Sequence, residues 1–338
     1  MPITTVGIDL AKNVFELCGL DADGEVVFRR RVRRETLLKA VGELPACIIG
    51  VEACTGAFYW QRRFEELGHE VRIIAAQHVK PFARRQKNDR NDAEAIAVAI
   101  RQPRMRFVPK KTIEQQDIQT LHRARRRLVN HRTALVCQMR GILLDRGIAF
   151  GQSITRARRM IPEIIADRSN ELSDMCRDII ASLLAFMHEI DARIREFDRR
   201  IDQVFRENRA CQRIAKIRGV GPKTATAVIA AVGTGRDFDN GRHMAAWLGL
   251  VPRQHSSGNR RVLMGISKRG DRHLRTLLVH GARAVVRTAA GKTDRFSLWV
   301  NDLKERRGMN RAIIAVANKN ARVIWALLNS GEEYRPAV

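Results

Sequence analysis

The chain has 338 residues, of which 45% are hydrophobic and 29% charged, so it can bury the cores of two or three domains and is not a disordered basic tail. Its 62 Lys and Arg residues outnumber 36 Asp and Glu residues, for a formal net charge of +26. This excess favours a polyanionic partner, nucleic acid first. No stretch approaches the roughly 20 apolar residues of a spanning helix, and the start MPITTVGIDL lacks the layout of a signal peptide. We therefore expect no membrane association and a cytoplasmic, nucleoid-associated protein.

The first hundred residues alternate strand and helix signals. Predicted strands span 3–11, 14–21, 25–33, 46–53 and 69–75, and predicted helices span 35–44, 57–67 and 92–101. The first three strands form a meander, and the later elements alternate helix and strand. This order predicts an α/β domain over 1–108, with a mixed sheet flanked by helices.

Two long amphipathic helices are predicted next, over 112–146 and 171–206, within a helical region at 109–210. Apolar residues recur every seven positions in both helices, at Leu121, Leu128, Leu135 and Ile142 and at Cys176, Leu183, Ile190, Phe197 and Val204. A second set in the later helix interleaves with the first, at Leu172, Ile179, Met187, Ile194 and Ile201. Such seams favour coiled-coil pairing, either within one subunit or between subunits.

The last region, 211–338, is predicted to be helical and basic, with glycine turns. In IRGVGPKTATAVIAAVG, the segment GVGPK stands between two apolar helical stretches, which is the layout of a helix-hairpin-helix element. Gly219, Gly221 and Lys223 are its candidate phosphate-binding residues, because hairpin amides and a helix N-terminus can hold an anion. The alternative is an ordinary interhelical turn.

Carboxylates stand at the ends of two predicted strands and inside a basic stretch. Asp9 ends the first strand in VGIDLAK and Glu52 ends the fourth in IIGVEACTG, so both emerge at one sheet edge if these strands are parallel neighbours. Asp89 and Asp92, at i and i+3, share one side of a helix or its first turn. Four such acids repel one another unless a hard cation neutralises them, which predicts a Mg²⁺ or Mn²⁺ site for phosphate chemistry.

A simpler explanation exists for the two later acids. Asp89 or Asp92 could cap a helix or pair with Arg85, Arg90 or Arg101 at the surface. Solvation explains Glu52 and Asp9 poorly, because each directly follows an apolar run. Glu94, two residues beyond Asp92, is expected to point away from it and to be solvated.

The ordered set GIDLAK, GVEACTG and KNDRNDAEAIA, followed by GLVPRQHSSGNRR and GISKRGDRHLRTLL, resembles the DEDD-type transposases of the insertion-sequence family usually numbered one hundred and ten, close to its eleven-eleven subgroup. The resemblance covers essentially the whole chain. It implies a RuvC-like domain of the ribonuclease H fold at 1–108, a central coiled coil at 109–210 and a helical transposase domain at 211–338. It also implies a recombinase that excises and inserts its element between donor and target DNA, guided by a structured bridge RNA.

By this resemblance the family's four acids correspond to Asp9, Glu52, Asp89 and Asp92, and its serine falls in QHSSG. Ser257 is preferred over Ser256, because Gly258 directly follows it and lets a backbone approach closely. A serine that attacks a DNA phosphate stores the bond as a phosphoserine ester, so the strand can be rejoined without an external energy source. Many relatives have a second glycine where this chain has Asn259. Without the resemblance, a serine in SSG is more often an ordinary loop residue.

Basic residues surround both motifs. Between positions 80 and 132 the chain has fifteen Lys or Arg and five Asp or Glu. The candidate phosphate contacts are Arg84, Arg85, Lys87 and Arg90 beside the acids, and Lys268, Arg269, Arg272 and Arg275 in the later motif; a merely solvated helix face is the alternative for the later four. Because aromatic residues make up only 5% of the chain, duplex DNA or structured RNA is a more natural partner than an unpaired strand.

Three other functions compete with recombination. A RuvC-like junction nuclease needs the acids but not Ser257. An actin-like sugar kinase also begins with a GID strand, but it needs further glycine-rich phosphate loops and no such charge. A nucleic-acid-binding protein without enzymatic activity needs neither acids nor serine. We expect a homo-oligomer, a dimer through the long helices, and the sequence leaves open whether dimers pair into tetramers on DNA.

Overall fold

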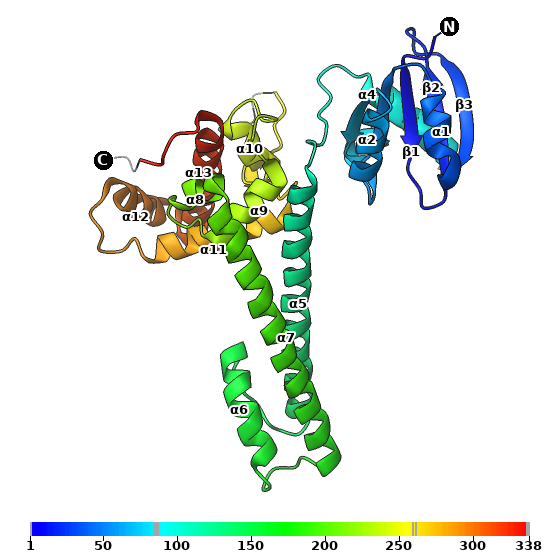
Figure 1. The fold of residues 1–338 in the computed structure, drawn as a ribbon. Coiled ribbons are helices and arrows are strands. Elements are labelled where there is room, and N and C mark those ends of the chain that lie inside the picture. The colour runs from blue at the N-terminus through cyan, green and yellow to red at the C-terminus, as the bar shows by residue number, and fades with distance from the viewer. Residues whose placement is uncertain (1, 84–87, 259, 261, 336–338) are drawn as a thin grey trace. The chain divides into compact units, whose positions relative to one another are not determined.

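The computed structural model of the chain describes residues 2–83, 88–258, 260 and 262–335. It divides into two compact units, Met1–Lys111 and Thr112–Val338 (Figure 1). The first unit holds a mixed α/β fold and the second is built mainly of helices. The predicted division into three domains stays a prediction, as do the coiled coil and the helix-hairpin-helix element.

The first unit contains a five-stranded sheet in the order β3-β2-β1-β4-β5. Its strands are β1 (Thr5–Asp9), β2 (Val14–Leu20), β3 (Val26–Arg33), β4 (Ile48–Glu52) and β5 (Glu70–Ile74). The first three strands pair antiparallel, whereas β1 pairs parallel with β4 and β4 with β5. This confirms the predicted mixed sheet and the parallel pairing that places the ends of β1 and β4 at one edge.

Helices cover both faces of this sheet. They are α1 (Leu37–Gly42) after the 3-10 turn η1 (Arg34–Thr36), α2 (Ala57–Glu65), α3 (Ala76–Val79) with η2 (Lys80–Phe82), and α4 (Asp89–Ile100). Val6 and Ile8 of β1 pack in the core with α1 and α2, whereas α4 contacts β1, β2 and β4 from the other face. α4 begins at Asp89 rather than at 92, because the Asn88 side chain caps it by accepting from the Asn91 amide at 2.8 Å.

Two glycines let α4 lie unusually close to the sheet. A Cβ atom on Gly7 would lie 2.2 Å from the Ala93 carbonyl oxygen and 2.5 Å from the Ala97 amide nitrogen. A Cβ atom on Gly50 of β4 would lie 2.6 Å from the Ile100 side chain. Since no side chain stands between sheet and helix at these points, the first turn of α4 is held at the depth of the strand ends.

Adding a methyl group at this contact should therefore destabilise the first unit. We expect Gly7→Ala to lower the free energy of unfolding by about 3 kcal/mol, because backbone atoms of α4 cannot yield as a flexible side chain would. Gly141→Ala is the matched control, since a Cβ atom there meets nothing within 4 Å and a helix-interior glycine gains about 0.5 to 1 kcal/mol on becoming alanine. Urea unfolding of both variants measures the difference, and equal midpoints would contradict the close-packing argument.

The second unit begins with two long helices, α5 (Ile113–Leu144) and α7 (Asp174–Glu207), which pack side by side, with α6 (Ile154–Ala166) against their far part (Figure 1). Both long helices were predicted, whereas α6 was not. The predicted seven-residue seam of α5 is only partly buried, and Ile179 of α7 is 48% exposed. Polar groups also join the helices: Asp191, 5% exposed, accepts from Arg132 at 2.9 Å and from Arg158 at 2.6 Å.

The rest of the second unit packs around one apolar core. Its helices are α8 (Arg209–Ala215), α9 (Pro222–Val232), α10 (Gly241–Trp247), α11 (Arg272–Arg287), α12 (Arg295–Arg307) and α13 (Met309–Ser330). Between α10 and α11 lies an antiparallel hairpin of β6 (Pro252–Gln254) and β7 (Leu263–Ile266). The prediction of a purely helical region was wrong here, because neither strand buries a face and the sequence lacks the alternation of a half-buried strand. Among the described helices, none is both long and apolar enough to cross a bilayer.

Candidate active site

Three carboxylates from different elements of the first unit meet at one point. Asp9 ends β1, and Asp89 and Asp92 lie in the first turn of α4. One carboxylate oxygen from each lies within 4.8 Å of the other two. The predicted convergence of Asp9 with the pair on the helix is therefore present, although the residues are about eighty positions apart in the chain.

Glu52 lies beside this cluster rather than within it. It ends β4, the parallel neighbour of β1, and is half-buried. The three acids that satisfy the 4.8 Å distance do not include Glu52, but its charge acts on Asp9 and raises the pKa of that carboxyl. The predicted group of four is thus a close trio with Glu52 as an electrostatic neighbour.

A Gly-X-acid pattern occurs in both β1 and β4, and it explains why the acids of the strands lie near those of α4. Gly7 and Asp9 lie two residues apart on β1, and Gly50 and Glu52 do so on β4, so each glycine shares a sheet face with its acid. The glycines are the positions where α4 approaches most closely. Each acid therefore emerges on the face that α4 covers, near the start of that helix.

The electrostatics of the cluster are unfavourable to three bare anions. Burial raises the pKa of the Asp9 carboxyl from 3.8 to about 6, and the charges of Asp92 and Asp89 act in the same direction. Glu52 and Glu16 add smaller effects of the same sign. The amide end of α4 favours negative charge in its first turn and offsets part of the repulsion. A bound cation would therefore stabilise this site by neutralising the repulsion among its carboxylates.

The donor set fits a hard divalent cation. All three ligand groups are carboxylates, the preferred ligands of Mg²⁺ and Mn²⁺. Two oxygens on opposite sides of a Mg²⁺ ion are about 4 Å apart, twice the usual Mg–O distance of about 2.1 Å. The oxygens of Asp9, Asp89 and Asp92, all within 4.8 Å of one another, are close to that arrangement.

The raised pKa of Asp9 predicts a pH-dependent stability. Because the folded carboxyl binds its proton more tightly than the unfolded one, its stabilising contribution is present below about pH 4 and is lost as the pH rises through about 6. Relative to Asp9→Asn, the wild-type protein in a chelating buffer should lose on the order of 1 to 2 kcal/mol between about pH 4 and pH 7, allowing for solvent screening. Urea unfolding of both proteins across this range measures the difference. A constant difference would contradict the raised pKa.

The described residues test most of the capping and ion-pair alternatives for Asp89 and Asp92. Asn88 caps α4, and within the described part of the first unit neither aspartate forms an ion pair with Arg90 or Arg101. Arg101 instead donates to the carbonyl oxygens of residues 21 and 22, at 2.5 Å each. The cap and the pairings with Arg90 and Arg101 are therefore absent, whereas the third predicted partner, Arg85, lies outside the described residues.

The prediction that Glu94 is solvated was wrong. Its side chain is 14% exposed and forms an ion pair with Arg29 of β3. The two residues are 65 positions apart, so the packing of α4 against the sheet brings them together. Among the predicted basic contacts nearby, Arg84, Arg85 and Lys87 lie outside the described residues, and Arg90 is exposed on the first turn of α4.

The second unit presents both candidate serines on the β6–β7 hairpin, beyond the paired strands. Ser257 forms an isolated bridge with Arg260, with backbone bonds of 3.3 and 3.0 Å. The Ser256 hydroxyl accepts from the Gln254 side chain at 3.0 Å and from the Val262 amide at 3.4 Å. Within the described residues the Ser257 hydroxyl has no such partner, and both serines are exposed. Gly258 adopts φ 52°, a conformation that favours glycine.

The turn before α9 is packed tightly against α11. Gly219 has φ 85°, and a Cβ atom there would lie 2.8 Å from the Gly281 carbonyl oxygen. The Asn320 side chain donates to the Arg218 carbonyl at 2.9 Å. Gly219 thus serves the contact between helices, whereas Gly221 faces open space and begins α9. Phosphate binding at this turn stays a prediction.

The remaining predicted basic residues differ in whether their side chains already contact other groups of the protein. Lys223 lies 3.0 Å from the Asp198 carboxylate, and Arg275 donates to the carbonyl oxygens of Leu248 at 3.0 Å and Arg269 at 2.9 Å. Three others, Lys268, Arg269 and Arg272, are exposed. Two of the predicted contacts therefore have structural partners already.

Comparison with known proteins bears on all of these positions. The Transposase IS116/IS110/IS902 family matches residues 211–297, and a DEDD-type IS110 transposase family matches residues 6–146. The transposase for insertion sequence element IS1111A of Coxiella burnetii is 46% identical over 98% of this chain and 92% of its own length. The chain belongs to the IS110 family of transposases. A probable family 20 transposase of Pseudomonas aeruginosa is 45% identical over 99% and 100%, and the transposase for IS1328 of Yersinia enterocolitica is 36% identical over 97% and 98%.

Membership makes this transposase a DNA-acting enzyme of an insertion sequence, and its DEDD-type domain is of a kind that uses divalent metal. The matched segment 6–146 holds all four predicted acids, and 211–297 holds both serines. The resemblance inferred from the sequence motifs is therefore confirmed at the level of the family.

One charged neighbour of the transposase site was not predicted. Glu16 of β2 lies directly opposite Asp9 in the antiparallel register, and its charge raises the pKa of Asp9. Its carboxylate also lies 3.3 Å from Arg31. The signal was available in the sequence, since a short turn between two predicted strands fixes which residues face each other.

Proposed function

We propose that this transposase excises and inserts its element by cutting and rejoining DNA strands through Ser257, with divalent metal held by Asp9, Asp89 and Asp92 and with Glu52 supporting them. The convergence of the three aspartates carries the proposal, because a cluster of bare carboxylates beside a basic segment has no evident structural purpose. Ser257 supports the second half, because it is exposed on the hairpin and its hydroxyl has no hydrogen-bond partner among the described residues.

The serine chemistry conserves the phosphodiester bond. The Ser257 oxygen forms a bond to a DNA phosphorus atom while the bond from that phosphorus to one deoxyribose oxygen breaks. The serine proton leaves to a base and the released sugar oxygen takes up a proton, so the ester can later be attacked by a new hydroxyl and the strand rejoined. A bound Mg²⁺ or Mn²⁺ ion supplies Lewis-acid polarisation of phosphate oxygens.

The carboxylates contribute through their placement. Asp9, fixed at the end of a buried strand, and Asp89 and Asp92, fixed on one helix turn, are held by the sheet-to-helix contact at Gly7 rather than by mobile loops. Rigid support of this kind keeps ligand geometry within the narrow tolerance of an octahedral ion. Glu16 and Glu52 add negative charge around Asp9 and favour cation binding.

We further propose that the active form is a homo-oligomer. Three apolar residues of α7, Met175, Ile179 and Phe186, are 74%, 48% and 49% exposed and lie on one helix face at spacings of four and seven. A second copy covering this stripe gives a dimer through the long helices, and pairing of dimers on DNA gives a tetramer. A monomer by light scattering at micromolar concentration, with and without nucleic acid, contradicts this part.

Guidance by a structured RNA follows from the family resemblance and from the charge. The net charge of +26 exceeds what a small DNA contact needs and suits a second polyanion. Sequencing RNA that co-purifies with the protein, then testing matched donor and target plasmids with Mg²⁺, examines the proposal. We expect one RNA transcribed from the element and recombination that depends on it. Activity without any bound RNA would refute guidance while leaving the chemistry intact.

The second candidate is a RuvC-like structure-specific nuclease without a serine intermediate. The close trio of aspartates supports it equally well, since hydrolysis needs the acids alone. The two functions can be distinguished by whether the cut DNA strands are rejoined, because a nuclease leaves free strand ends and a serine recombinase leaves none.

A further inference from the structure

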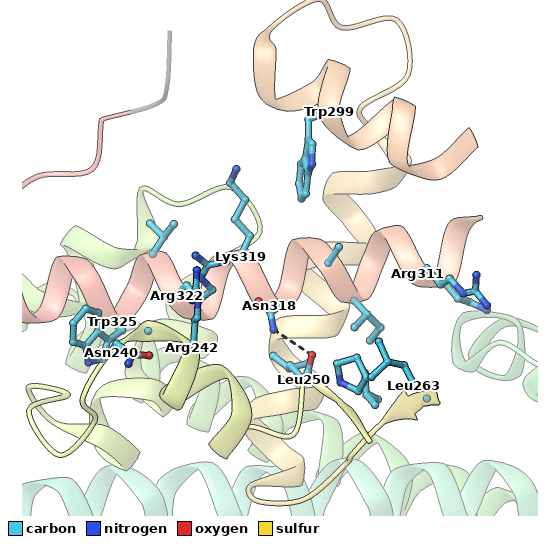
Figure 2. A pocket seen from close by; sticks show the side chains of 18 of the residues that line it. Asn240, Arg242, Leu250, Leu263, Trp299, Arg311, Asn318, Lys319, Arg322 and Trp325 are labelled. Carbon is cyan, nitrogen blue, oxygen red and sulfur yellow. Dashed lines mark hydrogen bonds between the residues drawn. The ribbon is translucent and has the colours of Figure 1, made fainter. Parts of the chain in front are cut away.

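The second unit contains a wide groove that the proposed chemistry does not use. It has a volume of about 1310 Å³, and one face of α13 forms its wall together with residues of α10, α12 and the β6–β7 hairpin (Figure 2). The residues of α13 that line it extend from Asn310 to Ala326, which spans about 24 Å of helix at 1.5 Å per residue. The groove is thus long enough for several nucleotides of an extended strand.

Its charge is entirely of one sign. Four cations line it, Arg242, Arg311, Lys319 and Arg322, and all four are exposed. None of the described residues in its lining is an aspartate or glutamate. The smaller pocket of 360 Å³ beside α5 and α7 differs, because three acids line it, Glu114, Asp117 and Glu207, against one cation, Arg200. A polyanion is therefore the complementary occupant of the large groove.

Its floor is apolar and aromatic. Leu250, Ile266 and Ile314 lie in it, and the rings of Trp299 and Trp325 stand at its sides (Figure 2). The Lys319 ammonium lies 4.7 Å from the centre of the Trp299 ring, which places a cation and a flat aromatic surface together.

Hydrogen bonds hold these walls in place. The Trp325 indole donates to the carbonyl oxygens of Gly235 and Phe238, both at 3.1 Å, and Asn318 of α13 donates to Leu250 at 3.2 Å. The groove is therefore a built feature of the fold and not a gap between loosely packed helices.

We propose that this groove binds unpaired nucleotides of a DNA strand, with phosphates on its basic rim and bases on its apolar floor. A duplex keeps the flat faces of its bases stacked inside and exposes only their edges and the backbone, so tryptophan rings gain no stacking partner from it, whereas unpaired bases stack on such rings. An apolar protein helix would leave the four cations without partners. This inference departs from the expectation, based on composition, that stacking matters little.

The choice of DNA over RNA rests on the proposed function of Ser257. Pro252 of β6 and Leu263 and Ile266 of β7 line the groove, and the same hairpin carries Ser257 at its far end. A strand lying in the groove runs alongside the hairpin that bears the proposed nucleophile. The groove then acts as the seat of a DNA strand that is unpaired during exchange.

The test measures binding of a short fluorescein-labelled single-stranded oligodeoxynucleotide to the full chain by anisotropy, in a Ser257→Ala background. We expect Arg311→Ala/Arg322→Ala to weaken binding about 10-fold and to reduce the slope of log affinity against log salt by about 1.4. Arg283→Ala/Arg287→Ala, two exposed arginines of α11 outside the groove, removes the same charge and should change binding less than about 3-fold. Equal losses in the two double variants would overturn the proposal.

A second variant tests the stacking surface. Trp299→Ala should lower the affinity for the single-stranded oligodeoxynucleotide about 10-fold and leave the affinity for a duplex of the same sequence unchanged. Circular dichroism and a melting curve verify its fold, and Lys319→Ala repeats the test at the same point without removing the ring. An oligoribonucleotide bound more tightly than DNA through the same residues would assign the groove to RNA and reject our choice.

Failure here and failure of the proposed function are distinguishable. Binding in the Ser257→Ala background does not depend on any covalent step, so it persists if the serine is not the nucleophile. Conversely, if the groove variants bind the oligonucleotide as the wild-type protein does, the groove proposal fails. A covalent adduct formed by the wild-type protein would still support Ser257 as the nucleophile.

Discussion

Asp9→Asn is expected to reduce metal-dependent DNA cleavage by about three orders of magnitude while leaving the fold intact. Asparagine keeps the shape of the side chain but removes one of the three charges of the cluster, whose other members are Asp89 and Asp92. The unfolding temperature should not fall, because burial and, to a smaller extent, repulsion by neighbouring acids raise the pKa of this carboxyl to about 6, and asparagine has no charge to bury or repel. Cleavage of an end-labelled substrate containing the element's terminus, with Mg²⁺, measures the effect.

Glu94→Gln is the matched control for this substitution. Glu94 is an acid of α4, like Asp89 and Asp92, but it pairs with Arg29 away from the trio. The substitution should lower the free energy of unfolding by about 1 kcal/mol, because the Arg29 guanidinium loses a charged partner. It should leave the rate of cleavage within a few-fold of wild type. If Asp9→Asn cleaved as well as Glu94→Gln, the cluster would not be the metal centre of the reaction.

The sheet could be predicted because most of its strands are buried. Most appear in the sequence as short apolar runs ended by polar or glycine residues, β3 with its four arginines being the exception, and the meander with a crossover fixes β1 and β4 as parallel neighbours. That reasoning placed Asp9 and Glu52 at one edge. It could not place α4, whose depth depends on Gly7 and Gly50 meeting Ala93, Ala97 and Ile100 across the sheet.

What the sequence could not predict has one physical cause, the lack of a local periodic signal. The β6–β7 hairpin is exposed on both faces, so no alternation marks it, and the contact of Glu94 with Arg29 joins residues 65 positions apart. Likewise, the four cations of the groove come from α10 and α13, whose proximity depends on the packed core. Asp9 and Glu52 could be found because each follows an apolar run, and Asp89 and Asp92 because they stand inside a basic stretch, whereas no comparable local signal marks the groove residues.

Ser257→Ala should abolish both the covalent protein–DNA adduct and recombination, whereas Ser256→Ala should retain the adduct within about 10-fold of wild type. The Ser257 hydroxyl makes no hydrogen bond within the described residues, so it is available for attack. The Ser256 hydroxyl accepts from Gln254 and Val262, so its loss loosens the hairpin at a cost of about 1 kcal/mol without removing a nucleophile.

The serine prediction is measured by trapping the reaction with detergent and locating the phosphorylated peptide by mass spectrometry, with a substrate that cannot be religated. An adduct that survives in Ser257→Ala and disappears in Ser256→Ala would identify Ser256 as the nucleophile. Cleavage without any adduct in the wild-type protein would favour the RuvC-like nuclease. Rejoining distinguishes the two mechanisms physically, because only the phosphoserine ester keeps the energy of the broken phosphodiester bond available for the new strand.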